Sequence, residues 1–249
     1  MIISYRRRFL FIHIEKAAGT SVKKALGPYA HRPLFHHRVF RKLGLHGLYP
    51  HYKMRMWTEH LGAAAVKHEL PAWEWDRLFR FTFVRNPWDL ELSRYFFYRA
   101  MKNWSPEDPR AIATNRAGSF RAYLDWRQEQ RIKRQVDYIF DEGGAPLLHF
   151  VGRVETIDGD FETVTKKIGI DARLPHVNQF NTTAYRKSTD YRDHYDDESA
   201  AIVERLVRKD IAVLGYAFDN RGLAPVRLGR IAAEAAPAQA GAIPRVATA

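Results

Sequence analysis

The chain has 249 residues, of which 46% are hydrophobic and 13% aromatic, so it can bury a full core in one domain or at most two small ones. A formal net charge of +12 favours anionic partners, such as nucleotides, sulfated or acidic glycans, nucleic acid or a membrane surface. The absence of cysteine excludes disulfides and thiolate metal sites.

The N-terminus has basic residues followed by a short apolar run, a pattern superficially like that of a signal peptide. The run is too short and continues directly into Glu15 and Lys16 without a cleavage site. No later segment approaches the ~20 apolar residues that span a bilayer. We therefore expect a soluble cytoplasmic protein with no transmembrane segment. Peripheral contact with a membrane stays compatible with the charge, and the oligomeric state is left open.

Residues 9–14 form an apolar, β-prone run, and helix formers resume at about Val22. Between them lie small residues, a lysine and two hydroxyls, which together predict a strand, a tight loop and a helix. Such a loop directs successive N–H groups to one point at the positive end of the helix dipole. The stretch suits a phosphate or sulfate group, although an ordinary turn with Thr20 as the helix N-cap is an alternative interpretation.

Residues 28–57 are basic and aromatic without clear periodicity, and we expect them to border a cleft on the acceptor side of a site. Their five histidines have no metal-binding spacing and no nearby carboxylate, so no metal site is predicted. Residues 58–70 are typical of a helix with Thr58 as its N-cap and Pro71 after its end. His60 would then lie in the first turn.

A second strand is predicted over residues 79–84, followed by a helix from about Trp88 to Lys102 that Pro87 can begin. Arg85 stands at the end of the strand, and Ser93 follows eight residues later on the helix. A forked guanidinium and a nearby hydroxyl suit a phosphate group. The alternative is that Arg85 pairs with a carboxylate and Ser93 packs within the helix.

The rest of the chain alternates helical and extended patterns, which implies a parallel α/β sheet with helices on both faces. The remaining predictions are a surface loop over 104–118, a helix over 120–134, a strand over 147–155, and helices over 160–168 and 197–211. We expect one domain over residues 1–220, followed by a flexible tail over 221–249 that is rich in Ala, Pro, Gly and Arg.

Two segments carry a resemblance to a known family. The order Lys16-Ala17-Ala18-Gly19-Thr20-Ser21 after an apolar strand resembles the 5′-phosphosulfate loop of sulfotransferases, and residues 83–93 resemble the segment with which these enzymes grip the donor's 3′-phosphate. Glu15 replaces the family's usual loop proline, and Leu90 replaces a common arginine. The resemblance covers roughly residues 7–218 and is nearest to the carbohydrate-type branch that includes heparan sulfate 2-O-sulfotransferases and chondroitin sulfotransferases.

This resemblance implies a three-layer, P-loop NTPase-like sulfotransferase fold and in-line transfer of a sulfuryl group from 3′-phosphoadenosine 5′-phosphosulfate to a hydroxyl of a carbohydrate, glycolipid or similar acceptor. No metal is required, because the protein supplies the positive charge. Lys16 would stabilise the leaving group, and His60, with His68 as competitor, would be the base. The implied donor-binding residues are Lys16, Ala17, Ala18, Gly19, Thr20, Ser21, Arg85, Ser93 and Arg186.

Interpretations from other functional classes stay open. A nucleotide kinase would need a Walker A lysine after its glycine, and here the lysine comes first. A nucleic-acid-binding protein would explain the charge, but the basic residues are dispersed and no recognition motif is present, so nucleic acid is not expected as a partner. The remaining alternative is a nucleotide-binding protein that has lost catalysis.

Overall fold

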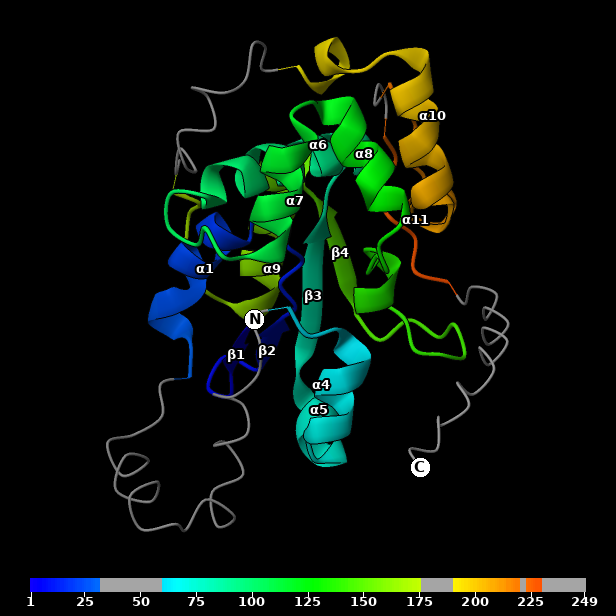
Figure 1. The fold of residues 1–249 in the computed structure, drawn as a ribbon. Helices are drawn as coiled ribbons and strands as arrows, with labels where there is room; N and C mark the ends of the chain where they lie inside the picture. The colour runs from blue at the N-terminus through cyan, green and yellow to red at the C-terminus, as the bar shows by residue number, and fades with distance from the viewer. Residues whose placement is uncertain (32–59, 176–189, 220–222, 230–249) are drawn as a thin grey trace, which may run out of the picture.

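The computed structural model describes residues 1–31, 60–175, 190–219 and 223–229. Its centre is a four-stranded sheet in the order β1-β2-β3-β4, formed by β1 (Ile2–Ser4), β2 (Phe9–Phe11), β3 (Phe79–Val84) and β4 (Phe150–Arg153) (Figure 1). Strands β2, β3 and β4 are parallel, whereas β1 pairs antiparallel with β2. The chain is thus an α/β protein with a mixed sheet, and the prediction of a parallel sheet is wrong for its edge strand β1. A short turn joins β1 to β2, and such a turn reverses the chain.

Helices surround this sheet. The α-helices are α1 (Gly19–Leu26), α4 (Ala63–Glu69), α5 (Ala72–Arg77), α6 (Pro87–Met101), α7 (Pro109–Ala117), α8 (Phe120–Gln128), α9 (Ile157–Ile168), α10 (Asp197–Leu206) and α11 (Arg208–Leu214). The 3₁₀ turns are η1 (Gly27–Tyr29), η3 (Val136–Tyr138), η4 (Val154–Thr156) and η6 (Tyr191–His194).

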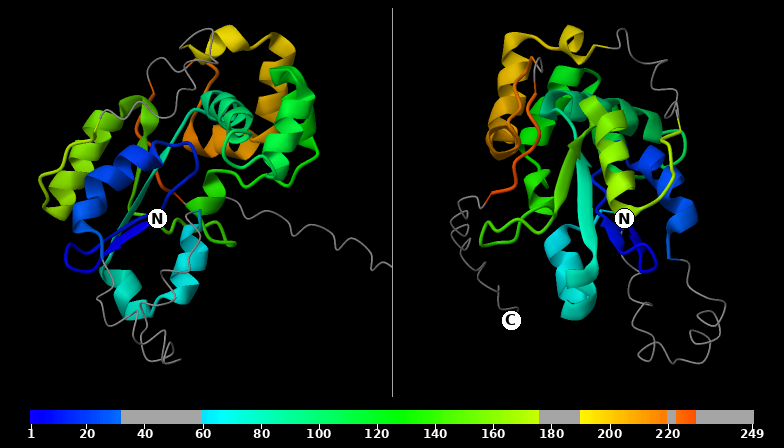
Figure 2. Two further views of the ribbon diagram at one scale, coloured as in Figure 1. Left: turned by 60° about the vertical axis from the view of Figure 1, so that its left-hand side comes forward. Right: turned by 180° about the vertical axis from the view of Figure 1, so that it is seen from behind.

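Successive side chains along each strand point to opposite faces of the sheet, and helices cover both faces (Figure 2). On one face Phe9 and Phe11 of β2 join Phe81 and Phe83 of β3, and α1 and α9 cover these rings. On the other face the buried side chains of the sheet pack against α4, α5 and α11. Helices therefore lie on both faces, as the alternating strand and helix patterns predicted.

A third cluster lies beyond the carboxyl ends of the strands, where α6, α7, α8 and α10 pack on one another (Figure 1). Glu91 is buried at its centre and accepts hydrogen bonds from Arg94 at 2.5 Å and Arg127 at 3.1 Å. Burial alone would raise the pKa of Glu91, but the two guanidinium charges hold it at about 2. These paired charges lie inside an otherwise apolar cluster of aromatic and aliphatic side chains, and the sequence analysis did not predict them.

Several predicted boundaries differ from the structure. The loop expected over 104–118 contains α7, which begins where Asp108 caps the helix and Pro109 starts it. The helix expected over 58–70 is wrong at its start, because α4 begins at Ala63 after Gly62. Pro71 ends α4 but also precedes α5, a helix that the sequence analysis missed.

The later elements follow the predictions more closely. Helix α8 ends at Gln128 rather than 134, and the helix expected over 197–211 is two helices, because Val207 has φ −126° and ψ 32°. Helix α9 begins at Ile157 and ends, as predicted, at Gly169, whose left-handed φ of 66° suits glycine. The predicted strand and helix at 79–84 and 88–102 are confirmed by β3 and α6.

Packing continues past the predicted domain end. Leu223, Val226 and Leu228 lie against the core that contains β4 and α11. Arg153 connects the segment 223–229 to α11, because its guanidinium donates to the carbonyl oxygens of Leu214 and Ala224. Residue 220 itself, most of the acceptor segment 28–57 and most of the tail 221–249 lie outside the described residues. Across the described ranges, none of the helices has the length and apolar character needed to span a membrane.

Candidate functional site

The site is built on the loop that follows β2, at the carboxyl edge of the parallel strands. Lys16 and Ala18 both adopt left-handed backbone conformations, with φ of 65° and 57°. The first hydrogen bond of α1 runs from the Val22 N–H to the Ala18 carbonyl oxygen, so the N–H groups of Gly19, Thr20 and Ser21 point out of the helix end. Among the described residues no side chain caps this helix, and its first turn has no acidic residue. The interpretation of Thr20 as an N-cap is therefore wrong.

Gly19 is required here by a close approach rather than by its backbone angles. A Cβ atom built on Gly19 would lie 1.7 Å from Nε2 of His13, so the imidazole fills the space that any other side chain would take. His13 is 7% exposed, and burial together with nearby positive charges lowers its pKa to about 2. The ring is therefore neutral, and it lies directly against Gly19 behind the loop.

Lys16 extends from the loop toward α6. Its Nζ lies 4.2 Å from the ring centroid of Phe97, a cation–π contact. Burial lowers the pKa of Lys16 to about 8, the positive charge of Arg85 acts in the same direction, and Glu15 opposes both. The ammonium is thus mostly protonated at neutral pH, yet it gives up a proton more readily than a solvated lysine does.

Arg85 connects residues 83–93 to the loop that contains Lys16. Its Nη1 donates to the Lys16 carbonyl oxygen at 3.1 Å, across 69 positions of sequence. Its other guanidinium nitrogens pair with Asp89 at 2.7 Å, as in the carboxylate alternative. The backbone of Arg85 is held by Gln135, whose side chain accepts from its N–H at 2.9 Å and donates to its carbonyl oxygen at 2.8 Å.

Helix α6 presents one face to the loop. Asp89 pairs with Arg85, and Phe97 contacts Lys16. Ser93 stands four residues from each of them, so it lies between them on that face. Its side chain is half-buried, and the structure brings Lys16, Arg85 and the helix face that carries Ser93 to the carboxyl ends of the parallel strands.

His60 also reaches this edge, but not from the predicted helix turn. It lies before α4, with its ring centroid 4.7 Å from that of His13 and its Nδ1 3.4 Å from the His13 carbonyl oxygen. A carbonyl oxygen only accepts, so this contact favours the tautomer with hydrogen on Nδ1 and a lone pair on Nε2. His68 is exposed in the last turn of α4. Of the two candidate bases, His60 is the one in contact with the loop.

Three supporting residues were missed by the sequence analysis. Glu15, which stands in place of a proline, accepts from the Tyr98 hydroxyl at 3.2 Å and lies 3.8 Å from Arg110. Lys133 donates to the His60 carbonyl oxygen at 3.1 Å, and Gln135 clamps Arg85. The charges of Glu15 and Lys133 were the only sequence signal for these contacts, and the neutral Gln135 gave none, because the partners of all three are far apart in the sequence.

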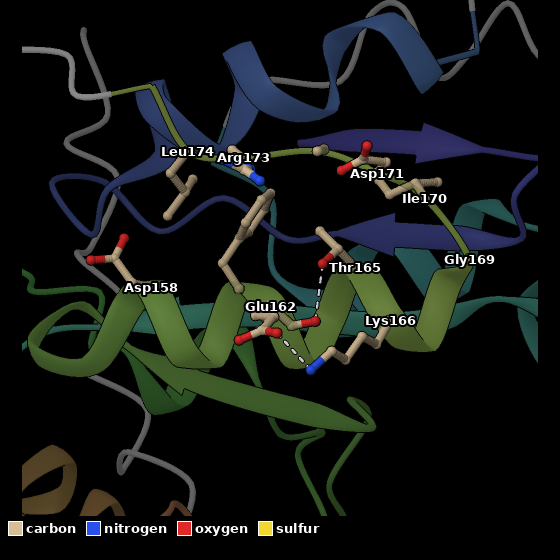
Figure 3. Close-up of a pocket in the computed structure, with 11 residues that line it drawn as sticks. Asp158, Glu162, Thr165, Lys166, Gly169, Ile170, Asp171, Arg173 and Leu174 are labelled. Atoms are coloured by element: carbon tan, nitrogen blue, oxygen red, sulfur yellow. Dashed lines mark hydrogen bonds and ion pairs between the residues drawn. The ribbon is translucent and has the colours of Figure 1, made fainter.

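The remaining features lie outside this site. Arg186 falls outside the described residues. A cavity of about 710 Å³ lies between α9 and residues 169–174, where an ion pair of Glu162 and Lys166 marks its rim (Figure 3). None of the predicted site residues lines it. The part of the chain that the structure describes contains no group of three or more His, Asp or Glu side chains arranged to hold a metal ion.

Comparisons of the chain with models of protein families, with curated proteins and with solved structures give no match. The geometry defines an α/β protein with a mixed open sheet. A loop at the carboxyl ends of its parallel strands brings together a lysine, an arginine and the N-terminus of α1, which no side chain of the described residues caps.

Proposed function

We propose that this protein is a sulfotransferase that moves the sulfuryl group of 3′-phosphoadenosine 5′-phosphosulfate to a hydroxyl of a carbohydrate, glycolipid or similar acceptor. The observation that carries the proposal is the contact between Arg85 and the Lys16 carbonyl oxygen. It joins the two segments that resemble the 5′- and 3′-binding parts of one nucleotide. Nothing in the sequence indicates that these two segments need to meet for structural reasons alone.

In this proposal the 5′-phosphosulfate lies at the open end of α1. The N–H groups of Gly19, Thr20 and Ser21 point there, and the helix dipole adds positive potential. Lys16 stabilises the charge that develops on the leaving phosphate oxygen, and its lowered pKa of about 8 also lets it share a proton with that oxygen. The 3′-phosphate is assigned to Arg85 and Ser93, with Asp89 exchanging part of its contact with Arg85 for the phosphate.

Transfer needs a base for the acceptor hydroxyl. We assign this role to His60, since hydrogen on Nδ1 leaves the Nε2 lone pair to take the proton. The S–O bond to the leaving phosphate breaks as the bond to the acceptor oxygen forms, and the acceptor proton passes to Nε2. Positioning and fixed charge supply most of the acceleration, as in phosphoryl transfer.

The deciding experiment is titration calorimetry of the full chain with adenosine 3′,5′-bisphosphate, followed by an assay of sulfuryl transfer from the donor to a panel of glycan acceptors. We expect saturable binding that Lys16→Ala and Arg85→Ala both weaken. Binding without transfer to any acceptor would favour a nucleotide-binding protein without catalysis. Absence of binding would refute the proposal.

A further inference from the structure

A second cavity lies at the amino ends of the parallel strands, opposite to the loop of Lys16. There the β1–β2 turn meets α5, at the lower end of the sheet in Figure 1. The Phe79 N–H donates to the Arg8 carbonyl oxygen at 2.8 Å, which fixes the turn beside the start of β3. The cavity measures about 400 Å³ and is lined by Tyr5, Arg8, His31, Trp73, Glu74, Arg77 and Leu78.

Glu74 is the unusual member of this lining. It is 7% exposed, and its Oε2 atom has no hydrogen-bond partner among the described residues. The Tyr5 hydroxyl donates to the same carboxylate, so one oxygen has a donor while the buried Oε2 has none among the described residues. A buried carboxylate oxygen without a donor is costly, and a cationic N–H group is the donor that compensates best.

The walls suit a cation as well. Tyr5 and Trp73 supply aromatic rings, whose faces attract ammonium groups, and His31 packs edge-on to Tyr5 at 5.0 Å. Trp73 is 60% exposed, which is unusual for so large an apolar ring, and the Arg77 guanidinium lies 5.7 Å above it.

The mouth of the cavity has the opposite preference. Arg8 and Arg77 are both exposed there, and they outnumber the single carboxylate. Their charge would repel a simple cation but would pair with an anionic group on the same molecule. The lining as a whole therefore matches a ligand that carries both charges.

We propose that this cavity binds a small zwitterion whose primary ammonium donates to Glu74 Oε2 against the rings of Tyr5 and Trp73, while its phosphate or carboxylate pairs with Arg8 and Arg77. This inference does not depend on the proposed sulfotransferase activity, because it involves none of the same residues and lies at the other edge of the sheet.

The test is titration calorimetry of the full chain with phosphoethanolamine and β-alanine, which carry the two kinds of acid. We expect saturable binding of at least one of them. Phosphocholine, which has no ammonium N–H, and ethanolamine, which has no acid group, should each bind at least about 10-fold more weakly, since each forfeits a charge-assisted contact. No binding of either zwitterion, or equal binding of phosphocholine, would overturn the proposal.

Variants separate this site from the loop of Lys16, where a phosphate could also bind. Glu74→Gln should weaken the zwitterion roughly 10- to 100-fold, whereas Asp76→Asn, an equal charge change on the exposed side of α5, should not. Arg77→Ala, a surface change that keeps the fold, should weaken the zwitterion but not ethanolamine. A probe that loses affinity in Lys16→Ala and keeps it in Glu74→Gln is bound at the other edge, and that result refutes the assignment.

Discussion

The contact of Arg85 with a 3′-phosphate offers the sharpest test of the proposed donor site. In the structure the Arg85 guanidinium makes two contacts of 2.7 Å with Asp89 and one of 3.1 Å with the Lys16 carbonyl oxygen. We predict that Arg85→Ala weakens adenosine 3′,5′-bisphosphate far more than adenosine 5′-phosphate, which lacks the 3′ group. Both affinities are measured by titration calorimetry.

The size of the effect follows from the neighbours of Arg85. A charge-assisted hydrogen bond contributes about 1.5–3 kcal/mol, equivalent to roughly a 10- to 100-fold change in affinity. Asp89 neutralises part of the guanidinium charge before the nucleotide arrives, so we expect a value near 10-fold. For the same reason Asp89→Asn, which frees Arg85 and removes a negative charge, should tighten the bisphosphate several-fold and leave adenosine 5′-phosphate unchanged.

Two controls protect this interpretation. Arg85→Ala also removes a contact with the Lys16 carbonyl oxygen, and any damage to the loop would appear as weaker adenosine 5′-phosphate. Arg99→Ala, a change of the same kind at the far end of α6, should affect neither ligand. An equal loss for both nucleotides in Arg85→Ala would mean that Arg85 only supports the loop, and the reasoning would be refuted.

Four further predictions concern catalysis and stability. Lys16→Ala should reduce turnover on the order of 10²-fold or more while circular dichroism stays native, and near wild-type turnover would contradict its role. His60→Ala should lower the rate by roughly 10²- to 10⁴-fold with donor affinity intact in calorimetry. Gly19→Ala should lower the thermal midpoint and donor affinity together, because its Cβ would lie 1.7 Å from His13 Nε2; an unchanged midpoint would show that the ring moves freely. Burial raises the pKa of Asp210 from 3.8 to about 6, so its contribution to stability is full below pH 4 and is lost as the pH rises through 6. Denaturant titrations should therefore show wild type losing ~3 kcal/mol over this range relative to Asp210→Asn, and parallel pH profiles would refute this.

The sequence by itself determined the parts of this protein that depend on local pattern. The apolar runs at 9–14 and 79–84 predicted strands, and the small residues and hydroxyls between 15 and 21 predicted a tight loop before a helix. Gly169 marked a helix end because glycine adopts the left-handed angle found there without the steric cost that a side chain adds. Alternating strand and helix patterns were enough to predict an α/β sheet with helices on both faces.

The predicted helix boundaries were wrong where one residue type is typical of two kinds of local structure. Pro71 was interpreted only as the end of a helix, yet it also precedes α5, since proline is tolerated before and at the first turn. The loop predicted over 104–118 contains α7 because its start signals, Asp108 and Pro109, are also typical of turns. The local sequence does not distinguish a turn from the start of a helix. Packing against α6 and α8 stabilises the helix in the case of α7.

Only the tertiary structure decided which groups meet. It brought His60 against His13, gave Glu15 the partners Tyr98 and Arg110, and set Gln135 to hold the backbone of Arg85. It also buried Glu74 beside a turn 69 residues earlier in the chain. Such contacts are fixed by the register of the strands and the packing of helices on the sheet, which depend on all of the chain at once, whereas each strand and loop depends mainly on its own neighbours.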